Sequence, residues 1–192
     1  MCKKNISWLY PFIELLTTLL LTLLYVSIPH QYFLGYFVFF SALIVTIRSD
    51  IETMLISRFV TIFLVPLSCI FSATMLLPIT LTECIAGALF GYLFLFSINT
   101  IFAYLRNKQG IGEGDFDLLI YIGSCTGILG CWISITLGSL IGSFYGLYTL
   151  INTENNNDFS TDTKIPFGPF LAAGAILFVF LQKHFFNYLM LT

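Results

Sequence analysis

Asp50 and Asp115 are the residues of this chain whose type and position could carry out a reaction. Each aspartate stands at the end of a long apolar run and beside basic residues. We expect two membrane crossings between them, and an even number of crossings returns the chain to the side that it left. Both carboxylates would then meet at one membrane face. There an ionised aspartate can take a proton from water while a protonated one donates to a carbonyl oxygen, which is the chemistry of aspartic proteases.

A structural interpretation of the two aspartates stays open beside the catalytic one. Two carboxylates a few ångströms apart cannot both ionise cheaply, so a catalytic pair would titrate as one coupled unit. Aspartate is also a common residue at helix ends, and both positions could simply mark solvated helix ends.

The composition indicates a membrane protein. The chain has 192 residues, of which 58% are hydrophobic and 9% are charged, whereas a soluble domain carries about 25% charged residues. We therefore expect an all-α fold, a polytopic bundle of membrane helices that forms a single membrane-embedded domain over residues 1–192. Eight basic and ten acidic residues give a net charge of −2, which offers no sign of nucleic-acid binding.

The apolar runs predict about seven transmembrane helices, because a helix needs about 20 apolar residues to cross a bilayer. The fifth run is short and rich in glycine, and it is separated from the sixth near Gly130. Glycines at four-residue spacing, such as Gly87 and Gly91, predict close packing between helices. The predicted segments are 11–28, 32–47, 57–77, 82–105, 116–130, 132–151 and 166–182.

The basic residues predict which ends of these helices face the cytoplasm, because lysine and arginine favour that side of a membrane. If the N-terminus is cytoplasmic, seven of the eight basic residues lie inside and only Lys183 lies outside. The loops 48–58 and 106–116, which contain both aspartates, then lie at the cytoplasmic face. Glu83 falls on the outer side, where we expect it to stabilise the N-terminal end of a helix.

The second aspartate ends a run of alternate glycines, Gly110, Gly112 and Gly114. Such a backbone can take positive φ angles and lie flat against another chain. A helix expected to begin at about Asp115 would stabilise a carboxylate there through its dipole. A loop that can receive an extended peptide therefore ends in an acid.

Three blocks of the sequence carry a resemblance to a known family. They are SDIETMLIS at 49–57, GEGD at 112–115 and KIPFGPF at 164–170. In this order they resemble the type IV prepilin peptidases (prepilin leader peptidases), GxGD aspartic proteases in which one aspartate opens a D-x(5)-I-P motif and a second closes GxGD. The resemblance implies that Asp50 and Asp115 are catalytic and that Gly112 and Gly114 shape the loop.

The resemblance implies a membrane aspartic endopeptidase that cleaves the leader peptide of type IV prepilins or pseudopilins, with no metal or organic cofactor. It would lie in the bacterial inner (plasma) membrane, act at the cytoplasmic face, and serve a type IV pilus, type II secretion or DNA uptake. The implied substrate has a short basic leader, a glycine at the cut site and an apolar helix. Glu52, Glu113 and Asp117 could contact the basic leader, or they could be simple solvated charges.

The sequence departs from the family pattern at three places. Ser57 replaces a proline, and Asp117 stands where the family often has lysine, which adds negative charge beside the two aspartates. The N-terminal residues resemble the exit from the family's four-cysteine zinc domain. Of the four cysteines this sequence has only Cys2, and we expect the family's first membrane helix to be missing as well. One cysteine cannot hold a tetrahedral zinc. We therefore expect that the N-methyltransferase activity of the longer family members is absent.

Two alternatives to the peptidase stay open on the sequence. The aspartates could form a cation or proton site of a membrane transport or binding protein. The chain could also be an inactive, truncated remnant of a peptidase. The sequence does not indicate which pilin is the substrate or what the oligomeric state is.

Overall fold

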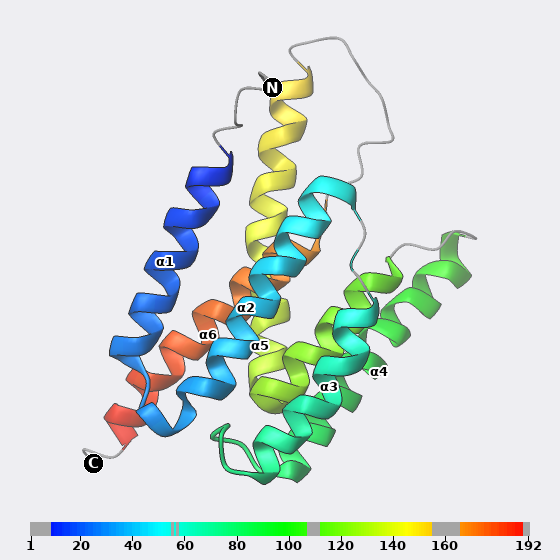
Figure 1. Cartoon of the computed structure of the whole chain (residues 1–192). Coiled ribbons are helices and arrows are strands. Elements are labelled where there is room, and N and C mark those ends of the chain that lie inside the picture. The colour runs from blue at the N-terminus through cyan, green and yellow to red at the C-terminus, as the bar shows by residue number, and fades with distance from the viewer. Residues whose placement is uncertain (1–8, 55, 57, 107–111, 155–165, 190–192) are drawn as a thin grey trace.

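The described part of the chain consists of helices and contains no strand. The computed structural model describes residues 9–54, 56, 58–106, 112–154 and 166–189. Within these residues the helices are α1 (Leu9–Ser27), α2 (His30–Thr53), α3 (Arg58–Ala73), α4 (Leu81–Arg106), α5 (Glu113–Glu154) and α6 (Gly168–Leu189) (Figure 1). The prediction of an all-α bundle is confirmed.

The predicted number of seven transmembrane helices is not confirmed. Among the described residues, three helices are long and apolar enough to cross a membrane, namely His30–Thr53, Leu81–Leu105 and Glu113–Thr149. The other apolar stretches are shorter, at 10–17 residues, and lie in α1, α3 and α6. The three long helices support the membrane character of the chain.

Helix α5 covers two of the predicted segments, 116–130 and 132–151, as two helical parts that meet at a kink. Its backbone leaves helical geometry at Gly127, where φ is 72° and ψ is −174°. Glycine adopts a positive φ without steric cost. The bend lies close to the boundary predicted near Gly130, and Figure 1 shows the chain reversing its direction there. We call residues 113–126 the first limb of α5 and residues 128–154 the second limb.

The two limbs of α5 pack against different helices. In the first limb, Leu119 lies so close to α4 that a Cβ on Gly91 would be 2.7 Å from its carbonyl oxygen. In the second limb, a Cβ on Gly138 would lie 2.9 Å from the carbonyl oxygen of Phe170 in α6. The close helix packing predicted from the glycine spacing is thus present, and the bend at Gly127 gives α5 both neighbours.

The contact between Gly87 and Gly123 predicts a large loss of stability for Gly87→Ala. A Cβ on Gly87 would collide with the carbonyl oxygen of Gly123 and would lie 2.8 Å from the carbonyl carbon of Gly127. Both obstacles are backbone atoms, so α4 and α5 must separate, and we expect a cost of about 3 kcal/mol. Thermal unfolding of the purified protein in detergent measures the loss. The control is Gly142→Ala, whose Cβ would meet the ring of Phe170 at 3.3 Å; equal unfolding temperatures for the two variants would contradict the expectation.

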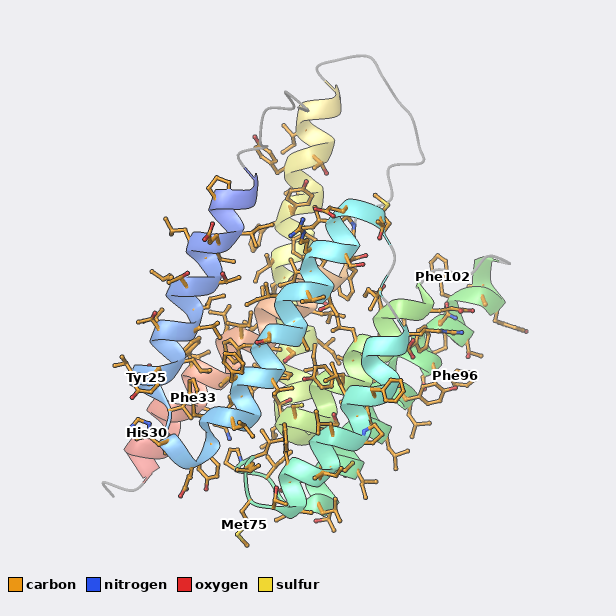
Figure 2. All side chains as sticks on the ribbon, in the orientation of Figure 1. Tyr25, His30, Phe33, Met75, Phe96 and Phe102 are labelled. Carbon is orange, nitrogen blue, oxygen red and sulfur yellow. The ribbon has the colours of Figure 1, made fainter. Side chains whose placement is uncertain are left out.

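Asp50 and Asp115 lie at the same end of the bundle. Asp50 is in the last turns of α2, Asp115 is in the first turn of α5, and α6 begins beside them at Gly168. Figure 1 shows these helix ends together, and in Figure 2 the turn between α1 and α2, marked by Tyr25 and His30, lies at the opposite end.

The ends of the helices differ from the prediction in a way that matters for the site. Helix α2 was expected to end near residue 47, but it continues to Thr53, so Asp50 is a helical residue and does not lie in a loop. Met54 then ends the helix with φ 53°, and its N–H donates to the carbonyl oxygen of Asp50 at 2.9 Å. Helix α5 begins at Glu113, two residues before the position predicted.

Glu83 has the structural role that the sequence predicts. It lies in the first turn of α4, and its carboxylate accepts hydrogen bonds from the N–H of Thr80 at 2.8 Å and from the Thr80 hydroxyl at 2.9 Å. The N–H of Glu83 donates in turn to the Thr80 hydroxyl at 3.3 Å. This reciprocal pair is a capping box, which satisfies free N–H groups at a helix start.

Candidate active site

Asp50 is a buried carboxylate with a backbone hydrogen bond. Its exposed fraction is 6%, and its Oδ2 accepts a hydrogen bond from the N–H of Gly168 at 3.1 Å. Gly168 is the first residue of α6, where the backbone N–H groups have no partner within the helix and the helix dipole attracts negative charge. The start of α6 therefore supplies a donor directly to Asp50.

Asp115 is half-buried in the first turn of α5, at the same end of the bundle as Asp50. Its backbone N–H donates to the carbonyl oxygen of Gly112 at 3.1 Å, which fixes the turn into the helix. The residue before Asp115, Gly114, packs against Ile56, and so does Gly168, whose N–H donates to Asp50. The structure thus brings together two acids that are more than 60 residues apart in the sequence.

One apolar side chain fills the space between the glycines of the site. A Cβ on Gly114 would lie 2.7 Å from the Cβ of Ile56, and a Cβ on Gly168 would lie 3.1 Å from the Cδ1 of the same isoleucine. Gly168 is also limited by Asp50, whose Oδ2 would be 2.6 Å from the added Cβ. Gly112 is less confined, because the nearest atom to its added Cβ is Asp115 Oδ2 at 3.5 Å.

The three acids considered as leader contacts all lie in ion pairs with arginine. Arg48 Nε is 3.1 Å from Glu52 Oε1 within α2. Arg58, at the start of α3, approaches both of the others, with 2.7 Å from its Nη2 to Glu113 Oε2 and 3.4 Å from its Nε to Asp117 Oδ2. The negative charge that Asp117 adds near the two aspartates is therefore offset by Arg58.

Sequence reasoning missed three parts of this site. The N–H of Gly168 and the side chain of Ile56 fall inside blocks that carried the family resemblance, but neither received a role. Arg58 was counted only as a cytoplasmic charge. One signal was available for it, since a basic residue in one loop and acids in another loop at the same face can pair.

Some predicted features lie outside the described residues, namely Cys2, Ser57, Gly110 and Lys164. Within the described ranges, no group of three or more His, Cys, Asp or Glu side chains is placed to hold a metal ion. Two carboxyl groups, those of Asp50 and Asp115, lie at this end of the bundle, and Asp50 accepts a hydrogen bond from a backbone N–H. Such a pair can hold one proton between its members and exchange protons with water and a peptide carbonyl.

Comparison with known proteins gives a consistent result. Residues 37–147 match the type IV leader peptidase family. The chain is 34% identical over 174 residues to a prepilin leader peptidase/N-methyltransferase of Aeromonas hydrophila, covering 89% of this chain and 58% of the relative. It is 29% identical over 185 residues to a type 4 prepilin-like proteins leader peptide-processing enzyme of Escherichia coli, covering 96% of this chain and 65% of the relative.

Other matches are shorter. A prepilin leader peptidase/N-methyltransferase of Pseudomonas aeruginosa is 39% identical over 95 residues, which cover 48% of this chain and 31% of the relative. The chain thus spans about 58% of the length of the first relatives that it matches. No solved structure matches the chain.

Proposed function

Because the chain belongs to the type IV leader peptidase family, we propose that it is a membrane aspartic endopeptidase that removes the leader of type IV prepilins or pseudopilins. The observation that supports this proposal most strongly is that Asp50 and Asp115 lie at one end of the bundle, where Ile56 packs against Gly114, next to Asp115, and against Gly168, whose N–H donates to Asp50. Neither acid has an arginine or lysine partner among the ion pairs of the described residues, whereas Glu52, Glu113 and Asp117 have one.

We propose different starting roles for the two aspartates. The N–H of Gly168 donates to Asp50 Oδ2, and such a hydrogen bond favours a carboxylate over a neutral acid at that atom. Asp50 would then be the base that takes a proton from water, while protonated Asp115 donates its proton to the carbonyl oxygen of the scissile peptide bond. The hydroxyl adds to the carbonyl carbon, and when the C–N bond breaks the leaving amine takes a proton from the pair.

The proposed membrane arrangement follows from the charges near this end of the bundle. Arg48 and Arg58 lie near Asp50, and we propose that this end faces the cytoplasm of a bacterial inner membrane. The substrate's basic leader would approach Glu52, Glu113 and Asp117 at this end of the bundle. The apolar helix of the substrate could remain in the lipid.

Incubation of the purified protein with a candidate prepilin in detergent tests the proposed function. We expect release of the leader as a separate peptide, with a cut directly after the glycine that ends the leader, as identified by mass spectrometry. The mass of the mature product also shows whether the new amino terminus is methylated. We predict that it is not, because we expect no N-methyltransferase activity. Thermal unfolding of the same preparation shows whether the protein is folded. A prepilin that stays intact with folded wild-type protein would contradict the peptidase assignment.

A further inference from the structure

Arg58 joins the two acids that flank Asp115 on α5. Its guanidinium is 2.7 Å from Glu113 and 3.4 Å from Asp117. Residues four apart lie on the same face of a helix, one turn from each other. One side chain from the start of α3 therefore spans the turn of α5 in which Asp115 lies.

The two ion pairs of Arg58 differ in their environment. The side chain of Glu113 is 73% exposed, so its pair with Arg58 lies in solvent and contributes little. The side chain of Asp117 is 23% exposed, and its Oδ2 is buried and accepts no hydrogen bond from the part of the chain that the structure describes. A buried carboxylate oxygen without a donor is costly unless a positive charge lies beside it. Arg58 supplies that charge.

Arg58 also lies where the chain passes from α2, which carries Asp50, to α3, and it pairs there with two acids of α5. It begins α3 directly after the connection from α2, eight residues beyond Asp50. The backbone of α2 packs mainly against α1 and α6, while α5 packs mainly against α3, α4 and α6. Near the site, Ile56 packs against Gly114, and Arg58 pairs with Glu113 and Asp117. Through these contacts, the residues that follow α2 pack against the start of α5, the helix that carries Asp115.

We propose that Arg58 is a positioning residue for the reaction, which holds the first turn of α5 so that Asp115 faces Asp50 and which offsets the charge of Asp117. This inference rests on the proposed peptidase function. Arg58 acts through Asp117 and the helix start, and no part of the role requires it to touch the substrate. A guanidinium can serve two carboxylates at once because its donors form a rigid fork, whereas lysine offers one point of charge.

The test compares Arg58→Gln, Arg58→Lys and the double variants Arg58→Gln/Asp117→Asn and Arg58→Gln/Glu113→Gln, in steady-state cleavage of a prepilin by purified protein. We expect Arg58→Gln to lower kcat by about 10- to 100-fold with KM within about twofold, since a small displacement of a catalytic group costs rate. Arg58→Lys should lie between it and the wild type. Adding Asp117→Asn should restore most of kcat, because the buried charge is then gone, whereas Glu113→Gln should not. An unchanged kcat for Arg58→Gln, or equal rescue by both second substitutions, would overturn the proposal.

Thermal unfolding of the same variants separates this inference from the proposed function. We expect Arg58→Gln to lower the unfolding temperature and the added Asp117→Asn to raise it again, a coupling that can be measured without any substrate. A wild-type protein that cuts no prepilin would contradict the proposed function, and the catalytic part of the Arg58 role with it. The pairing itself would be refuted if the two substitutions had independent effects on the unfolding temperature.

Discussion

Replacement of Asp50 or Asp115 by asparagine is expected to leave a prepilin uncut while the variant protein accumulates to the wild-type level. An asparagine keeps the shape of the side chain but can neither take a proton from water nor donate an acidic one. General acid–base catalysis contributes about 10²- to 10⁴-fold, so each variant should lose at least about 10²-fold in rate. Co-expression with the prepilin, followed by separation of precursor from mature pilin on a gel, measures the loss.

The matched control for both variants is Glu14→Gln, which makes the same change from carboxylate to amide on an exposed position of α1. We expect this variant to process the prepilin as the wild type does. Persistent processing by Asp50→Asn or Asp115→Asn would mean that the carboxyl group concerned is not part of the reaction.

The second large effect is expected for Gly168→Ala. The added Cβ would lie 2.6 Å from Asp50 Oδ2 and 3.1 Å from Ile56 Cδ1, so the carboxylate or the start of α6 must move. Either movement lengthens the 3.1 Å hydrogen bond from the Gly168 N–H to Asp50. Because a displacement of about 1 Å can cost about 10²-fold in rate, we expect a loss of this order in kcat. Steady-state cleavage of a prepilin by the purified variant provides the measurement.

Gly142→Ala is a suitable comparison for this variant as well. Its Cβ would contact Phe170 and Phe167, side chains that can adjust, and would not approach either aspartate among the nearest atoms. Gly168→Ala should therefore be much slower than Gly142→Ala at a similar unfolding temperature. Similar rates for the two would show that Asp50 does not depend on the start of α6.

The apolar runs predicted where helices lie better than where they end. A run of apolar residues measures the length that suits hydrocarbon, whereas a helix continues into polar residues until its backbone is capped. Helix α2 shows the difference, because it passes through Asp50 and ends only where Met54 adopts a left-handed conformation. Such a conformation at a methionine leaves no clear signal in the sequence, since glycine or asparagine is the usual residue there.

The two aspartates could be found from the sequence because a carboxylate at the end of an apolar run has few structural explanations. Their partners could not. The donor to Asp50 is a backbone N–H 118 positions away, and a backbone donor has no residue type of its own. The predicted number of membrane helices stays unconfirmed for a related reason, since a bend at Gly127 and a loop between two helices look the same as a glycine-rich interruption.

Arg58 illustrates a third kind of limit. The sequence indicated that its loop and the loop of Glu113 and Asp117 lie at the same face, but it did not indicate which charges pair. Asp117 therefore appeared as an added negative charge beside the aspartates. The structure places Arg58 3.4 Å from it, and the interpretation of that residue changes with this distance.

The most direct test of the central claim compares Asp50→Asn, Asp115→Asn and the double variant in single-turnover cleavage of one purified prepilin. If the two carboxyl groups work as one unit, replacing the second in a protein that already lacks the first lowers the cleavage rate little further. The residual rates of the three variants should then agree within about threefold. A single variant that keeps most of the wild-type rate, or a double variant whose loss is the product of the single losses, would contradict the account.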